Sequence, residues 1–169
     1  MEKTINEIIN EITRGLMGEE IWYVSCCGAA GSTFGLDMGR KIPRAFELKN
    51  KAHPKEFRQY EGEVRLNVWC NWRLDNAVGQ ITNSDDTDEV IEPGLEQVKG
   101  RKIIDVQIDL PFWDLHVKFD GDLTLHVFSD CLSGDSSLDN NWEVWLKERA
   151  FFFGPGQKYE ILRKVKQEK

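Results

Sequence analysis

The stretch that most constrains the fold is residues 112–130, FWDLHVKFDGDLTLHVFSD, where two alternating apolar and polar runs flank a glycine. Alternation on both sides of such a turn is typical of an antiparallel hairpin. A two-residue turn at Asp120-Gly121 would pair Phe119 with Asp122 and mix apolar and polar side chains on each face. A three-residue loop instead pairs Phe119 with Leu123. We prefer this second register because it keeps the apolar residues of both strands on one face.

The preferred register predicts what each face of the hairpin carries. On the polar face, His116 lies directly across from His126, with Asp114 two residues before His116. Directly opposed residues have Cβ atoms about 5 Å apart, and imidazole and carboxylate groups are zinc ligands, so these three residues form a candidate metal or catalytic site. The favoured interpretation is the simpler one, in which both histidines lie on a solvated or helix-covered face and form no site. The predicted core face holds six residues: Leu115, Val117, Phe119, Leu123, Leu125 and Val127.

Similar patterns along the chain predict the remaining elements. Isoleucines at helical spacing over residues 5–16, preceded by a capping-box pattern at Thr4 and Glu7, indicate an amphipathic helix that covers one face of a sheet. The sequence therefore predicts a single α+β domain over residues 1–169, with a predominantly antiparallel sheet of about eight or nine strands, open or barrel-like, the N-terminal helix and one short helix. Strands are expected over residues 21–27, 34–38, 63–74, 104–108, 142–147, 151–153 and 159–165, and the short helix over 90–99.

Composition excludes several classes of protein. With 40% hydrophobic and 30% charged residues the chain is of globular type, and it has no run of about 18 apolar residues that could span a membrane. A net charge of −7 argues against general nucleic-acid binding and would suit a basic partner. The first 16 residues lack the basic start and apolar core of a secretory signal, so we expect a cytoplasmic protein.

Motifs that would hold a cofactor are missing, and no cofactor is expected. The glycines at 28, 31 and 35 match neither dinucleotide nor P-loop spacing. The basic segment 40–58, interrupted by prolines, is interpreted as a long, mobile, solvated connection in preference to an anion site. Four cysteines in apolar surroundings are interpreted as buried free thiols in preference to a redox or zinc site, namely Cys26, Cys27, Cys70 and Cys131.

Aromatic and acidic residues outside the predicted core are candidate binding residues. Trp69 and Trp145 both fall on the polar side of their strands, where a tryptophan is either covered by a helix or loop, the interpretation favoured for Trp69, or part of a binding surface. Asp85, Asp86 and Asp88 belong to an acidic stretch that lacks EF-hand spacing and is suited to the start of a helix. Aromatic anchors beside acidic charge would suit a surface that binds a basic protein.

Three short segments resemble those of known proteins. The segments Trp69 to Leu74, WCNWRL, Leu123 to Asp130, LTLHVFSD, and Asn141 to Val144, NWEV, resemble small bacterial domains of uncharacterised function, some of them immunity proteins of polymorphic toxin systems. The resemblance covers roughly the C-terminal two-thirds of the chain and assigns no site residue. It implies a non-enzymatic protein that occludes a basic, toxin-like partner. The alternative is a metal-assisted hydrolase or small-ligand-binding β-domain that uses Asp114, His116 and His126.

Overall fold

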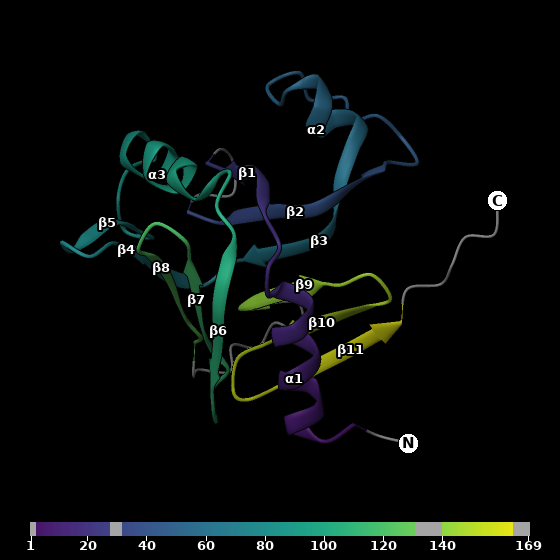
Figure 1. Ribbon diagram of the computed structural model, residues 1–169, viewed down its shortest axis with the longest axis vertical. Coiled ribbons are helices and arrows are strands. Elements are labelled where there is room, and N and C mark those ends of the chain that lie inside the picture. The colour runs from purple at the N-terminus through teal and green to yellow at the C-terminus, as the bar shows by residue number, and fades with distance from the viewer. Residues whose placement is uncertain (1–2, 28–31, 131–139, 164–169) are drawn as a thin grey trace.

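The computed structural model describes residues 3–27, 32–130 and 140–163, and these form two antiparallel sheets with three α-helices (Figure 1). The α+β class and the N-terminal helix are as predicted, and the eleven strands exceed the expected eight or nine. The six-stranded sheet has the order β1-β2-β3-β9-β10-β11, and the five-stranded sheet β5-β4-β8-β7-β6. The elements are α1 (Ile5–Leu16), β1 (Ile21–Cys26), β2 (Phe34–Pro43), α2 (Lys55–Gln59), β3 (Tyr60–Val68), β4 (Asn71–Asp75), β5 (Gln80–Asn83), α3 (Asp88–Leu95), the 3-10 turn η1 (Glu96–Val98), β6 (Ile103–Asp109), β7 (Asp114–Phe119), β8 (Leu123–Phe128), β9 (Trp142–Trp145), β10 (Arg149–Phe153) and β11 (Tyr159–Arg163).

The hairpin of β7 and β8 has the predicted three-residue loop. Phe119 pairs with Leu123, His116 pairs with His126, and Gly121 and Asp122 in the loop both have positive φ, at 76° and 61°. All six residues of the predicted core face are buried. They face a single apolar cluster that includes residues of both sheets, so each sheet has an inner face toward this core and an outer face away from it.

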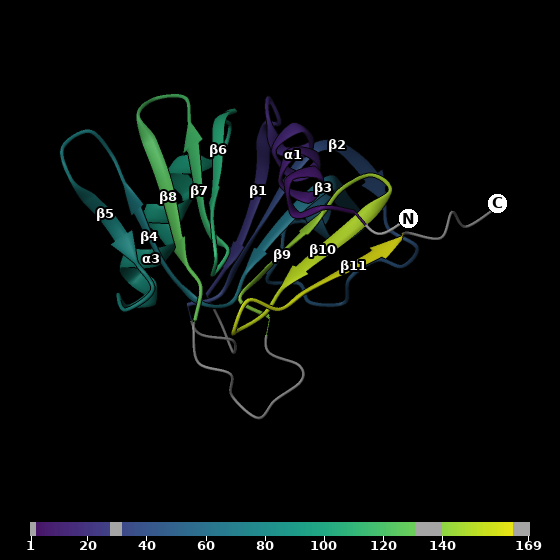
Figure 2. The same cartoon turned by 90° about the horizontal axis from the view of Figure 1, so that it is seen from below.

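The prediction of one strand over residues 63–74 is wrong, because the chain changes sheets in the middle of that stretch. β3 ends at Val68 in the six-stranded sheet, and β4 begins at Asn71 in the five-stranded sheet. The amide N–H groups of Trp69 and Cys70 both donate to the carbonyl oxygen of Asn141, at 2.8 and 3.2 Å, and this fixes the crossing. Alternation continues through it, since Val68, Cys70 and Trp72 are all buried. Figure 2 shows the two sheets diverging from this edge.

The helix α1 packs against the common core beside β6, and just after its end the Gly18 amide donates to the Ile103 carbonyl oxygen at 2.8 Å. Its capping box is formed as predicted, with the Glu7 amide donating to the Thr4 hydroxyl oxygen and the Thr4 amide donating to the Glu7 carboxylate. Ile8, Ile12 and Leu16 are fully buried against the common core. The predicted role of the isoleucine stripe, to cover sheet surface, is therefore confirmed.

Two local patterns differ from the sequence prediction. In β6 the pairing shifts register between Ile103 and Asp105, so Ile103 is buried and Ile104 is 46% exposed. A shift of this kind reverses which side chains face the core, and strict alternation cannot predict it. The short helix begins at Asp88, two residues before the predicted start, and its first turn carries Asp88 and Glu89, as expected for the positive end of a helix dipole.

The segment 44–59, which we call the strap, is not an isolated connection. β2 continues to Pro43, and the strap then returns across the outer face of the six-stranded sheet, where Phe57 is 3% exposed and its ring stacks on Tyr23 at 4.0 Å. Its two arginines are paired with carboxylates, Arg44 with Glu61 at 2.9 Å and Arg58 with Glu47 at 2.8 Å. This pairing leaves less positive charge for an anionic ligand than the sequence suggests.

Candidate functional site

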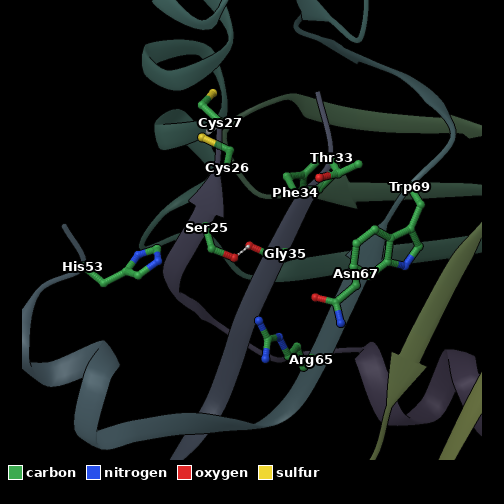
Figure 3. A pocket seen from close by; sticks show the side chains of 10 residues that line it. All are labelled: Ser25, Cys26, Cys27, Thr33, Phe34, Gly35, His53, Arg65, Asn67 and Trp69. Carbon is green, nitrogen blue, oxygen red and sulfur yellow. Dashed lines mark hydrogen bonds between the residues drawn. The ribbon is translucent and has the colours of Figure 1, made fainter. Parts of the chain in front are cut away.

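The candidate binding site is a hollow of about 170 Å³ on the outer face of the six-stranded sheet (Figure 3). Strands β1, β2 and β3 form its floor, His53 of the strap and Trp69 stand at opposite sides, and Cys26 and Cys27 lie at the end nearest α3. Small-molecule sites usually have volumes of about 300–1,000 Å³. A hollow of this size suits one inserted side chain better than a whole cofactor.

The floor of the hollow depends on Gly35. A Cβ atom at this position would lie 2.6 Å from Asn67 Oδ1 and 2.8 Å from Ser25 Oγ, both too close for any real side chain. The Ser25 hydroxyl donates to the Gly35 carbonyl oxygen at 3.3 Å. Glycine therefore leaves room for the polar ends of Ser25 and Asn67, which come from the two neighbouring strands, to lie over the central strand β2.

Beside the hollow lies a buried polar network between β3 and β9. The Asn67 side-chain amide donates to the Glu143 carboxylate at 2.7 Å, and the Trp145 indole N–H donates to the same oxygen at 3.0 Å. Asn67 and Glu143 are each only 9% exposed. Because a buried carboxylate without hydrogen-bond donors is costly, these contacts hold the wall of the hollow in one arrangement.

A second buried carboxylate, Asp37, lies further along the same outer face. It is fully buried, accepts a hydrogen bond from the Gly62 amide at 2.7 Å, and has the Arg65 guanidinium 3.6 Å away. Arg65 also lines the hollow. Its guanidinium therefore lies next to the buried Asp37 carboxylate and also brings positive charge to the open site. The hollow thus offers a cationic group, polar oxygens and an aromatic wall, a set of groups suited to binding.

The thiols and hydroxyl at the hollow are poorly suited to nucleophilic catalysis. Burial raises the pKa of Cys26 to about 12 and also raises the pKa of Cys27, so both are thiols near neutral pH. The Ser25 hydroxyl is bonded to a backbone carbonyl, and the ring of His53 is bonded through Nδ1 to the Tyr23 hydroxyl at 3.0 Å. Serine and histidine therefore do not form the nucleophile and base pair that acyl transfer requires.

The two predicted tryptophans lie at opposite ends of the β3 and β9 pair. Trp69 is 48% exposed at the rim of the hollow, and the cover that we favoured for it is not formed by the described residues. Trp145 pairs across the sheet with Arg65, is partly buried, and packs edge-on against Phe152 with ring centroids 5.5 Å apart. Trp69 is thus the more accessible of the two tryptophans. Trp145 instead donates a hydrogen bond to the buried Glu143 carboxylate.

The predicted acidic residues take two different roles. Asp86 is used locally, because its carboxylate accepts hydrogen bonds from the Thr82 hydroxyl at 3.1 Å and the Asn83 amide at 2.9 Å. Asp85 and Asp88 are exposed. The Asp88 carbonyl oxygen lies 4.0 Å from the Cys27 sulfur, so the acidic start of α3 borders the hollow. Three further exposed acidic side chains follow on α3 and η1, namely Glu89, Glu92 and Glu96.

The predicted metal residues lie on the outer face of the other sheet, and the structure brings two of the three together. His116 Nδ1 and His126 Nδ1 are 2.8 Å apart, whereas Asp114 accepts a hydrogen bond from the Ser129 amide at 2.7 Å. Within the part of the chain that the structure describes, no three His, Cys, Asp or Glu side chains are grouped to hold a metal ion. A metal bound by Asp114, His116 and His126 stays a prediction.

Two carboxylates that we did not predict lie behind the histidine rings. His116 Nε2 is 3.3 Å from Asp109 Oδ2, and His126 Nε2 is 3.4 Å from Asp75 Oδ2. Burial lowers the pKa of His126, and so does the neighbouring His116, although Asp75 opposes both effects. The signal available in the sequence was the alternation of β4 and β6, which places these carboxylates on the polar face once the strand order is known.

The comparisons with known proteins identify no relative. No family model, curated protein or solved structure matches the chain. Within residues 3–27, 32–130 and 140–163, none of the helices combines the length and apolarity needed to cross a bilayer.

Proposed function

We propose that this chain is a non-enzymatic protein-binding domain, immunity-like in action, which occludes a basic partner in the cytoplasm. The observation that carries the proposal is the half-exposed Trp69 at the rim of the hollow on the six-stranded sheet. Tryptophans at the edge of well-formed pockets commonly provide a large share of the binding energy in protein interfaces. The hollow would accept one side chain of the partner, and Trp69 would pack against the partner residues next to that side chain.

Charge supports a basic partner. The chain carries a net charge of −7, and the exposed acidic residues of α3 and η1 border the hollow at Cys27. Complementary charge beside an aromatic anchor speeds the encounter and orients the partner. The neutral thiols and the internally bonded Ser25 and His53 favour binding over covalent chemistry at this place.

The test is co-expression of the chain with the product of its neighbouring gene, followed by affinity measurement on the purified complex. We expect a stable complex whose dissociation constant rises about 30-fold in Trp69→Ala, equivalent to about 2 kcal/mol. The matched control is Phe128→Ala on the five-stranded sheet, where the side chain is also an exposed aromatic, at 38%. A Trp69→Ala variant that binds as tightly as the wild type would overturn the proposal, and so would the absence of any complex.

A further inference from the structure

The outer face of the five-stranded sheet carries a chain of polar groups that the proposed binding face does not use. It runs in one row from Asp109 through His116 and His126 to Asp75. β7 and β8 supply the two histidines as a directly opposed pair, and β6 and β4 supply the carboxylates from either side. Four adjacent strands therefore place the groups, which makes their arrangement a property of the sheet.

The orientation of the two rings is specific. Each ring has its Nε2 toward a carboxylate, where an N–H can donate, and the two Nδ1 atoms face each other at 2.8 Å, a hydrogen-bond distance that requires one of them to donate in the metal-free protein. Metal-ligating histidines almost always donate their second ring N–H to a carboxylate or carbonyl, because this fixes the tautomer that leaves the other nitrogen free to coordinate. Here both histidines have that support at once.

We propose that His116 Nδ1 and His126 Nδ1 together coordinate one divalent late transition-metal ion, such as Zn²⁺, with Asp109 and Asp75 as the carboxylates that orient the rings. Imidazole nitrogen is a favoured ligand for zinc, copper and nickel. Two nitrogens at about 2.0–2.1 Å from a tetrahedral zinc lie roughly 3.3 Å apart. Binding would therefore widen the present 2.8 Å separation by about 0.5 Å and turn the two rings, which now face each other Nδ1 to Nδ1, so that their lone pairs converge on the ion.

The surroundings of the pair hold the rings in place. Arg73 binds Asp75 through Nε at 2.8 and 2.9 Å, which fixes that carboxylate and offsets its charge, while Asp109 adds a second negative charge. The ring of His126 stacks nearly parallel to Phe128, at an interplanar angle of 11°. The histidine side chains are 25% and 23% exposed, so water or a ligand from another molecule can complete the coordination.

This site differs from the one predicted from the sequence in its ligand set. Asp114 is bonded to the Ser129 amide and is not needed, and the carboxylates act behind the histidines rather than on the metal. Two protein ligands hold an ion less firmly than three or four. The expected affinity is therefore micromolar, and the role is a metal bridge to a second molecule or a loosely held ion rather than a structural zinc.

The test is titration of the chelator-treated, fully reduced protein with Zn²⁺, followed by calorimetry and by ¹⁵N NMR of the histidine rings. We expect one equivalent to bind, with both Nδ1 resonances of His116 and His126 shifted and both Nε2 atoms still protonated. The affinity should fall at least tenfold in His116→Ala and in His126→Ala. The chain contains a third histidine, so His53→Ala is the matched control and should bind zinc like the wild type.

A second pair of variants keeps the result clear if the alanine variants unfold. Asp109→Asn and Asp75→Asn leave the coordinating rings in place and should weaken zinc binding about 10-fold to 100-fold, as is typical of residues that orient metal ligands. The proposal is overturned if the His116→Ala/His126→Ala double variant binds zinc like the wild type, if Nε2 and not Nδ1 responds, or if the folded wild type binds no zinc at 1 mM. The last outcome would leave the two rings as a hydrogen-bonded pair only.

Discussion

The outer faces of the two sheets have the same alternating sequence pattern, but their polar side chains differ in how exposed they are to solvent. On the six-stranded sheet the polar side chains are largely buried, since the strap crosses it and Asn67 and Glu143 are each 9% exposed. On the five-stranded sheet the polar row is open, with the side chains of His116 and His126 about a quarter exposed. Alternation predicts which face is polar, but the cover above that face decides whether its groups serve stability or remain available to bind.

The largest difference between the faces should appear in folding stability. Replacing Asn67 with Leu keeps most of the volume and removes the donor to the buried Glu143 carboxylate. We expect the free energy of unfolding to fall by about 3 kcal/mol, because a buried charge then loses a partner. The measurement is urea denaturation followed by tryptophan fluorescence.

The matched change on the open face is His126→Leu. Asp75 keeps its bond to Arg73 in that variant, and the site is partly solvated, so the loss should be within about 1 kcal/mol. Equal losses in Asn67→Leu and His126→Leu would show that the burial of the two faces does not differ in the way that the structure describes.

The next prediction distinguishes a loss of partner affinity from a loss of folding stability on the six-stranded sheet. Trp69→Ala should lower the affinity for the basic partner by about 2 kcal/mol and change the free energy of unfolding by no more than about 1 kcal/mol, because the side chain is 48% exposed. Calorimetric titration and urea denaturation measure the two quantities on one preparation. A large loss of stability with unchanged affinity would make Trp69 a packing residue.

A smaller effect is expected at the crossing between the two sheets, where Cys70 is 8% exposed. Burial raises the pKa of its thiol to about 12, whereas an unfolded cysteine has a pKa of about 8.5. From about pH 8.5 upward the unfolded chain loses this proton and the folded chain keeps it, so the free energy of unfolding falls with pH.

Cys70→Ala isolates this contribution. Between pH 7.5 and 9.5 the wild type should lose about 1 kcal/mol more stability than Cys70→Ala, as measured by urea denaturation at both pH values. The same loss in both proteins would mean that the thiol titrates alike in the folded and unfolded chain, contrary to its buried position at the crossing.

The smallest effect concerns the acidic residues that border the hollow. Changing Asp88, Glu89 and Glu92 to their amides should slow association with the basic partner about threefold at low salt, with little change in dissociation. At 0.5 M salt the variant and the wild type should associate at similar rates, since exposed charges are then screened. A salt-independent loss would mean direct contact instead of steering. Stopped-flow tryptophan fluorescence provides the rates.

Much of the fold could be predicted because it follows from local pattern. The register of β7 and β8 came from keeping Val117 and Leu125 on one face, and the structure pairs these two residues. The register shift at β6 and the change of sheet at Trp69 could not be predicted. The first reverses the facing of Ile103 and Ile104 within one strand pair, and the second keeps the alternation of buried residues while the chain moves to another sheet. Such changes depend on contacts with distant parts of the chain.

The candidate sites were predicted only in part for the same reason. Trp69 and the opposed histidines are visible in single strands. The hollow needs Ser25, Gly35 and Asn67 side by side, and these come from three strands up to 42 positions apart in the chain. Likewise, Asp75 and Asp109 reach the histidines only once β4 and β6 are known to flank the hairpin. Sequence alternation specifies faces, whereas strand order decides which residues meet on them.

The most direct test of the proposed binding function is backbone hydrogen exchange of the chain, free and bound to its neighbouring-gene partner. We expect slower exchange on binding around Trp69, in β1 and β2 at the hollow, and at the start of α3, with β7 and β8 unchanged in metal-free buffer. Protection confined to the histidine face, with the surroundings of Trp69 exchanging as in the free chain, would contradict it.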